Sequence, residues 1–149
     1  MKGVVLPALA LAALAAGCDS GGDPEPAPRE QPADAKVIRG WAAAVNDGSY
    51  DAAASFFARG AIVEQSQAVR LATREQAVAF NRSLPCRSTV TGVREEGRTT
   101  VASFKLRVGP AGTKANCDST VRVRFTIERG KFTVFRQLPE KPQPQGQAA

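Results

Sequence analysis

The sequence predicts an α+β domain in which three N-terminal helices pack on an antiparallel sheet. Apolar residues recur at helical spacing between residues 34 and 83, and alternating runs follow between residues 88 and 138. Gly-containing turns separate these runs. A chain of 149 residues has room for one such domain with an extension at each end, and we expect the folded part at 34–139.

The first helix is predicted over 34–46, with Asp34 as its capping residue. Its apolar stripe consists of Val37, Ile38, Trp41, Ala44 and Val45. A second helix is predicted over 49–58, capped by Ser49, because Gly60 then breaks the pattern. These two helices supply one apolar layer of the predicted core.

Two short strands are predicted next, over 61–65 and 68–72. The T-x-x-Q pattern of Thr73 to Gln76 is a capping box, which indicates a third helix ending near Ser83. After it, longer strands are predicted over 88–95 and 99–108. Residues 117–139 complete the sheet as a hairpin.

The hairpin can be paired residue by residue if Arg129 and Gly130 form its two-residue loop, with Gly130 supplying a positive φ. The resulting cross-strand pairs are Glu128–Lys131, Ile127–Phe132, Phe125–Val134, Val123–Arg136 and Val121–Leu138. This register puts Arg136 on the core face and Phe135 on the outer face. A bulge at the turn would shift it.

Residues 1–17 have the pattern of an export signal, with Lys2 before an apolar run that is short for a membrane span. The run ends in Leu-Ala-Ala-Gly-Cys at Cys18, which resembles the lipobox of bacterial lipoproteins. The resemblance implies lipidation of Cys18 and an extracytoplasmic protein anchored to the bacterial cell membrane. An ordinary signal peptide cut nearby, or a plain N-terminal anchor, is the alternative.

Residues 18–33 and 140–149 are rich in Pro, Gly and polar residues and contain little to bury, so we expect a disordered tether and a disordered tail. If Cys18 is lipidated, Cys86 and Cys117 are left. In an exported chain such a pair usually forms a disulfide, which would contribute about 3–4 kcal/mol. Two buried free thiols are the alternative.

The composition excludes several functions. The chain has no His, so His-containing metal sites, Ser-His-Asp and Cys-His catalysis are ruled out, and we expect neither metal nor cofactor. The net charge is +6, but the basic residues form no run, and no nucleic-acid partner is expected.

Three features together resemble the nuclear transport factor 2-like superfamily, especially its SnoaL-like branch, over about residues 35–138. These are Asp-Gly-Ser-Tyr at 47–50, the Phe-Phe pair at 56–57 and Arg-Gly-Lys-Phe at 129–132. The resemblance implies a curved sheet wrapped round the helices as a cone, a pocket at its open end, and frequent homodimers through the sheet. The superfamily includes isomerases, cyclases, dehydratases and non-enzymatic binding modules, so the fold does not set the function.

The pocket that this resemblance implies has seven candidate lining residues: Trp41, Phe57, Phe80, Phe104, Phe125, Phe132 and Arg136. Plain core is the alternative for the six aromatic residues, and a position near the strand end that extends to solvent is one alternative for Arg136. Arg136 could hold an anionic ligand. Otherwise it pairs with Glu64 or Asp51. Catalytic candidates are Glu64 or Asp51 as a base, and Tyr50, the only tyrosine. No Asp or Glu falls on a predicted inward strand position, which disfavours an isomerase-like enzyme.

A second candidate surface is a basic outer face of the sheet, made of Lys105, Arg107, Arg122 and Arg124. It could contact anionic lipid heads or cell-wall polymer, and a solvated face is the alternative. We therefore expect a lipid-anchored, non-catalytic domain that binds a small apolar or anionic ligand, or a protein partner, through its pocket or sheet. An enzyme or an envelope-binding module is the alternative.

Overall fold

The computed structural model describes residues 31–109 and 115–140. The expected signal segment, Cys18, most of the tether and all but the first residue of the tail lie outside the described residues, as does part of the loop before the last hairpin. The elements are α1 Ala33–Asn46, α2 Tyr50–Ala54, β1 Phe57–Glu64, β2 Ala68–Leu71, α3 Arg74–Ser83, β3 Arg87–Glu96, β4 Thr99–Arg107, β5 Thr120–Glu128 and β6 Lys131–Leu138.

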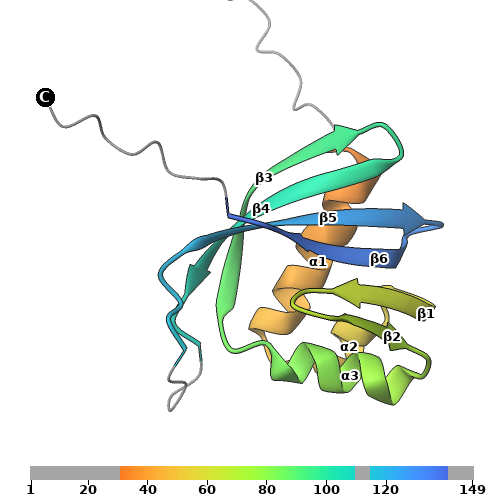
Figure 1. Cartoon of the computed structure of the whole chain (residues 1–149), viewed down its shortest axis with the longest axis horizontal. Coiled ribbons are helices and arrows are strands. Elements are labelled where there is room, and N and C mark those ends of the chain that lie inside the picture. The colour runs from red at the N-terminus through yellow and green to blue at the C-terminus, as the bar shows by residue number, and fades with distance from the viewer. Residues whose placement is uncertain (1–30, 110–114, 141–149) are drawn as a thin grey trace, which may run out of the picture.

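The strands form one six-stranded sheet in the order β2-β1-β6-β5-β4-β3. All neighbours are antiparallel except β1 and β6, which run parallel, so the sheet is mixed where a purely antiparallel one was predicted. The sheet curves, and α1 lies behind β5 and β6 in Figure 1, with α2 and α3 beyond β1 and β2. The predicted α+β class and cone-like form are confirmed.

Three irregularities in strand register accompany this curvature, because an extra residue bends and twists a strand. Thr91 in β3 and Thr133 in β6 are each left without a cross-strand partner. Their hydroxyls donate to the carbonyls of Ser103 and Thr126, both at 3.2 Å. The third irregularity, in β1, contains Gly60 at a φ of 79°.

The turn of the last hairpin forms as predicted. Arg129 and Gly130 have φ values of 50° and 72°, the pair of positive angles of a tight two-residue turn. Glu128 lies opposite Lys131, and the next pair also agrees with the predicted register.

Beyond those two pairs the predicted register is wrong. The extra residue Thr133 moves every later residue of β6 by one place, so that Phe135 lies opposite Phe125 and Arg136 opposite Arg124. Side chains alternate along a strand, and the shift exchanges the faces of the two residues. Phe135 is buried and Arg136 is exposed, the reverse of the prediction.

The second helix is also shorter than predicted. It ends at Ala54, and β1 begins at Phe57, where a helix had been expected to continue. The amide of Phe132 donates to the carbonyl of Phe56 at 2.8 Å, which starts the parallel pairing of β1 with β6. Pairing with the sheet thus overrides the local helical pattern, and Gly60 lies inside a strand.

Of the three predicted N-terminal helix caps, the structure confirms one. Thr73 and Gln76 form the predicted capping box. Ser49 makes no side-chain cap. Asp34 lies inside the first turn of α1, and its carboxylate accepts a hydrogen bond from the Thr100 hydroxyl at 2.7 Å.

The core is built around Trp41, the only tryptophan of the chain. Five phenylalanine rings have centroids 5.6–6.4 Å from its own, namely Phe57, Phe104, Phe125, Phe132 and Phe135. Its indole N–H donates to the side-chain oxygen of the fully buried Asn81 at 2.8 Å. The Asn81 amide in turn donates to the carbonyl of Ala77, also at 2.8 Å. The core polar groups are therefore satisfied.

The predicted disulfide between Cys86 and Cys117 is present, with Cα atoms 5.5 Å apart. It joins the segment between α3 and β3 to the segment that leads into β5. No helix among the described residues combines the length and apolarity that crossing a membrane requires.

Candidate functional site

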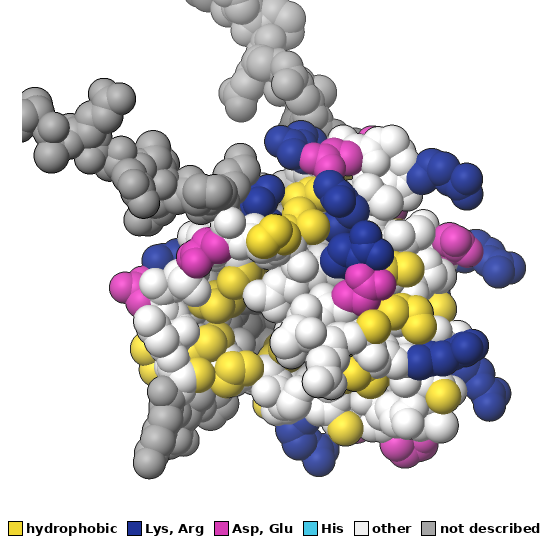
Figure 2. Space-filling model, viewed as in Figure 1, with side chains coloured by type: hydrophobic (Ala, Val, Ile, Leu, Met, Phe, Trp, Pro, Cys, Tyr) yellow, Lys and Arg dark blue, Asp and Glu magenta, His cyan; other side chains and the backbone are white. Residues whose placement is uncertain are grey.

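A cavity of about 260 Å³ lies between α1 and the concave face of the sheet. It occupies the end of the fold where the disulfide is found, and hydrophobic side chains also gather toward the left end of Figure 2. The lining residues are Trp41, Val45, Gln65, Leu84, Pro85, Cys86, Ser88, Phe104, Leu106, Ala115, Asn116, Val121, Val123, Phe135 and Gln137.

The floor of this cavity is aromatic and rigid. Trp41, Phe104 and Phe135 are each no more than 5% exposed. The indole N–H of Trp41 is already bonded to Asn81, so its ring offers the cavity an apolar surface. Val123 adds a fourth buried wall from β5. The floor therefore suits an apolar body.

The mouth carries neutral polar groups. The Gln65 side-chain amide donates to the Gln137 side-chain oxygen at 3.3 Å, and both side chains are exposed. Asn116 also lines the mouth, and its side-chain oxygen accepts the amide of Asp118 at 3.1 Å. The disulfide fastens this wall through Cys86.

None of the described residues that line the cavity is titratable, since Cys86 is bonded in the disulfide. Nor do the described residues contain a cluster of His, Cys, Asp and Glu side chains able to hold a metal ion. The chemistry available in this part of the site is burial of apolar surface together with hydrogen bonding by amides and a hydroxyl.

Of the seven predicted pocket residues, only Trp41 and Phe104 line this cavity. Phe125 and Phe132 are fully buried core. Phe57 and Phe80 line separate surface grooves. Arg136 lies on the opposite, convex face, for the register reason given above.

The three catalytic candidates also lie elsewhere. Glu64 accepts two hydrogen bonds from the Arg136 guanidinium, one of them at 3.2 Å. Asp51 is 78% exposed and lies 3.6 Å from Arg74. Tyr50 lies under the guanidinium of Arg82, 5.7 Å from the ring centroid. None of the three lines the cavity, and Glu64 at the end of β1 belongs to another element than Tyr50 and Asp51, which are consecutive in α2.

The convex face carries basic and acidic side chains close together, as Figure 2 shows over the strands. One cross-strand row passes over all six strands through Arg94, Val101, Arg124, Arg136, Glu64 and Ala68. Two arginines, Arg124 and Arg136, are therefore neighbours. Each has a carboxylate partner, which offsets their mutual repulsion.

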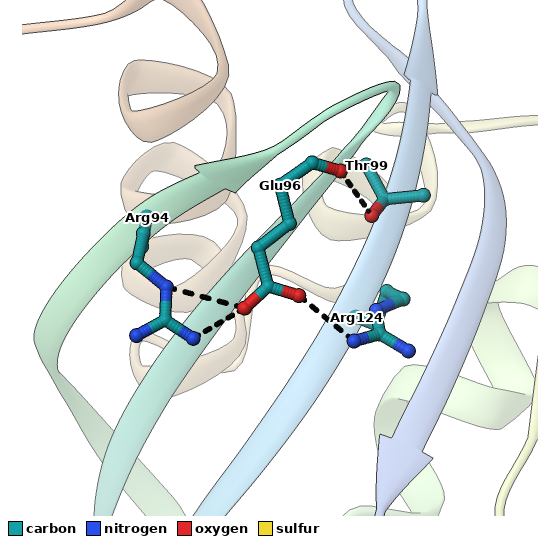
Figure 3. A network of polar contacts seen from close by, with 4 residues as sticks. All are labelled: Arg94, Glu96, Thr99 and Arg124. Atoms are coloured by element: carbon teal, nitrogen blue, oxygen red, sulfur yellow. Dashed lines mark hydrogen bonds and ion pairs between the residues drawn. The ribbon is translucent and has the colours of Figure 1, made fainter.

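Glu96 is the central acceptor of this face (Figure 3). One of its oxygens accepts from Arg94, at 3.1 Å for the Nε donor, and the other accepts from Arg124 at 2.8 Å. Its carbonyl accepts from the Thr99 hydroxyl at 3.0 Å.

Three other residues were predicted to form a basic face, and two of them have a partner. Lys105 pairs with Asp118 at 2.8 Å, and Arg122 donates to the carbonyl of Pro139 at 3.1 Å. Arg107 is exposed, and no partner of it is seen in the described chain. Two of the four predicted residues, Lys105 and Arg124, are thus ion-paired.

These ion pairs lower the pKa values of their carboxylates. The hydrogen bond from Arg136 holds the pKa of Glu64 below its ordinary value, and those from Arg94 and then Arg124 do the same for the pKa of Glu96. The hydrogen bond from Lys105 lowers the pKa of Asp118. Opposite charges favour the ionised form, so none of these groups is suited to take up a proton near neutral pH.

The sequence prediction missed most of the cavity lining, including Phe135, Gln137 and Gln65. Phe135 and Gln137 were placed on the outer face by the unshifted register, although the two-residue spacing between them already indicates a shared face. Gln65 was read only as the end of a strand. Asn81 was missed because its role depends on a contact with Trp41, forty residues away.

Comparison with solved structures finds the same fold. A nuclear transport factor 2-like protein of unknown function from Cytophaga hutchinsonii aligns with a TM-score of 0.58 at 12% identity, covering 74% of this chain and 93% of that chain. A protein with a ketosteroid isomerase-like fold from Catenulispora acidiphila, solved with trimethylamine, has a TM-score of 0.59 at 13% identity, covering 70% and 85%. An LEH-like epoxide hydrolase from M. tuberculosis has a TM-score of 0.57 at 14% identity, covering 70% and 80%.

No curated protein matches the sequence. Residues 38–135 match the family model of the SnoaL-like domain, and this stretch includes all three helices in whole or part and most of the sheet. The chain therefore belongs to the SnoaL-like domain family, with a nuclear transport factor 2-like fold.

Proposed function

We propose that this domain is a binding module, which holds a small, largely apolar molecule in the cavity between α1 and the sheet. The observation that carries the proposal is the lining itself, which joins a buried aromatic floor to a rim of neutral polar groups. Concave sites with apolar walls and a few placed polar groups are typical of small-molecule binding.

A catalytic role has less support. An isomerase or hydrolase of this architecture needs an acid or base that reaches the substrate. The carboxylates considered for that role are ion-paired on the convex face or exposed at α2, and the described lining of the cavity contains neither acid nor base.

Trp41 gives a direct test of the binding role, because the only tryptophan of the chain lines the cavity. Native mass spectrometry of the purified, oxidised protein should reveal a co-purifying apolar molecule. Its removal and re-addition should change the Trp41 fluorescence. Constant fluorescence with every added apolar compound would count against the proposal.

A matched pair of variants locates the binding. Val121→Phe fills the cavity from β5, whereas Val69→Phe makes the same change on β2, where the side chain is 53% exposed. The first variant should lose most of the bound molecule and the second should keep it. Equal retention by both would place binding outside the cavity.

We also propose that the domain is held at the outer side of a bacterial cell membrane by lipidated Cys18. The support is the sequence pattern of residues 1–18 and the disulfide between Cys86 and Cys117, which suits an oxidising compartment. Cys18→Ala should release the protein from the membrane fraction, with wild type as control. Continued membrane attachment of the variant would refute lipidation as the anchor.

A further inference from the structure

The polar side chains of the cavity are all uncharged in the described chain. They are Gln65 and Gln137 at the mouth, together with Ser88 and Asn116 elsewhere in the lining. A charged ligand would lose hydration in this cavity without meeting an opposite charge, which is costly. The lining therefore discriminates by charge as well as by shape.

Strand pairing places the two glutamines side by side. Glu64 and Arg136 are cross-strand partners of β1 and β6, and their ion pair lies on the convex face. Gln65 and Gln137 follow them by one residue each, and side chains alternate between faces, so both amides reach the cavity. The ion pair on the convex face and the amide bond on the cavity side therefore join the same two strand ends.

The amide pair has hydrogen-bonding capacity left over. The bond between them is 3.3 Å long, at the weak end of the range. Each amide group has two donor hydrogens and an acceptor oxygen with two lone pairs, and one bond uses a small part of this set. A ligand carbonyl could accept from an amide N–H, and a ligand hydroxyl could donate to an amide oxygen.

Charged side chains line a neighbouring groove that shares Val121 and Gln137 with the cavity, namely Lys105, Asp118, Arg122 and Glu140. Lys105 is paired with Asp118 at 2.8 Å, and Arg122 donates to the carbonyl of Pro139 at 3.1 Å. The residues on either side of Lys105 and of Arg122 line the cavity, so both cations project from the opposite face of the sheet, away from a ligand in the cavity.

We propose that the Gln65–Gln137 pair makes the cavity selective for uncharged ligands that have an apolar body and a single carbonyl or hydroxyl group. This inference rests on the proposed function, since it names the ligand class of the same cavity. The aromatic floor holds the body of the ligand, and the glutamine pair binds its polar group at the mouth.

The test uses three compounds that share the 4-tert-butylcyclohexyl frame. None has an aromatic ring, and because the ketone absorbs weakly in the tryptophan region, calorimetry accompanies fluorescence. They are 4-tert-butylcyclohexanone, 4-tert-butylcyclohexanecarboxylate and 4-tert-butylcyclohexylammonium. Titrations of the full oxidised protein, followed by Trp41 fluorescence and calorimetry, should give the ketone at least about tenfold tighter binding than either ion. Equal or tighter binding of the carboxylate or the ammonium overturns the inference.

Variants of Gln65 and Gln137 test whether this pair is responsible for the selectivity. Gln137→Leu and Gln65→Leu should each weaken ketone binding about three- to tenfold, because each removes a hydrogen-bonding partner of the carbonyl. Gln67→Leu is the matched control, since Gln67 lines a different groove, and it should leave binding unchanged. Gln137→Glu should shift the preference toward the ammonium. All three positions are exposed, so circular dichroism should show a native fold for each variant.

The outcomes separate this inference from the proposed function. Ketone binding that survives both leucine variants overturns the role of the pair and leaves the binding cavity standing. Failure of all three compounds to bind, in calorimetry as well as fluorescence, overturns both.

Discussion

At the scale of single residues, the buried hydrogen bond between Trp41 and Asn81 organises the aromatic cluster. Asn81 is fully buried and is bonded on both sides, to the Trp41 indole and to the Ala77 carbonyl. A buried donor without a partner costs more than the bond itself contributes, so the pair fixes one orientation of the Trp41 ring. That orientation sets the floor of the cavity.

Replacing Asn81 by Leu should therefore destabilise the protein by about 1–3 kcal/mol, because the Trp41 N–H loses its partner in a site without water access. Chemical denaturation followed by Trp41 fluorescence measures the loss. Ser83→Ala, on the exposed end of the same helix, should change the free energy of unfolding by less than about 0.5 kcal/mol. Similar effects of the two changes would contradict this role.

The ion pair of Glu64 with Arg136 predicts how the stability of the fold depends on pH. Its pKa is lowered in the folded state by the Arg136 hydrogen bond, so the pair stabilises the fold above the unfolded glutamate value of about 4.3. The contribution is lost as the pH falls through the lower folded pKa. The difference in melting temperature between wild type and Glu64→Gln should accordingly shrink as the pH falls from about 5 to about 3.

The control for this pH experiment is Glu95→Gln, because Glu95 is exposed on β3 and takes part in no ion pair seen in the described chain. Its difference from wild type should stay small throughout. A wild-type minus Glu64→Gln difference that is constant with pH would show that the ion pair contributes nothing.

At the scale of elements, the bulge at Thr133 decides which side chains reach the cavity. Alternation and the turn residues predicted the hairpin, its loop and its first two pairs correctly. The bulge was not predictable from alternation, because it is stabilised by cross-strand contacts such as the bond from the Thr133 hydroxyl to the Thr126 carbonyl. A shift of one residue then exchanged the faces of Phe135 and Arg136.

In the rest of the fold and in the site, too, local sequence signals were predictive and contacts between distant residues were not. Local signals such as the Thr73 capping box and the stripe around Trp41 predicted α3 and α1 correctly. The length of α2 was wrong because pairing with β6 draws Phe57 into a strand. The aromatic floor was partly predictable as buried apolar surface, whereas Gln65 and Gln137 meet only through the parallel contact of β1 with β6.

The register itself is testable with neighbouring residues. Phe135→Ala should cost about 3–5 kcal/mol, since its ring lies 5.2 Å from that of Phe125 and 5.6 Å from that of Trp41. Arg136→Ala should cost at most about 1 kcal/mol, because its ion pair is half exposed. Urea denaturation of both variants measures the two losses in the free energy of unfolding. The opposite order of effects would support the unbulged register.

At the scale of the whole molecule, the fold is a curved sheet closed at one end and open at the other. The β1–β2 end is covered by α2 and α3, whereas the cavity end is bounded by the segments before β3 and before β5. The described residues of those two segments belong to no helix or strand, and the disulfide joins the segments. The bond therefore acts on the shape of the mouth as well as on stability.

The disulfide links residues separated by 31 positions, and closing a loop of that size in the unfolded chain should contribute about 3–4 kcal/mol. Cys86→Ala combined with Cys117→Ala should lower the free energy of unfolding by that amount and weaken binding of an apolar ligand, because the mouth loses its fixed wall. Wild type in reductant should behave like the double variant, and reductant should not affect the variant further. Unchanged stability together with unchanged ligand affinity in the double variant would show that packing alone holds the mouth.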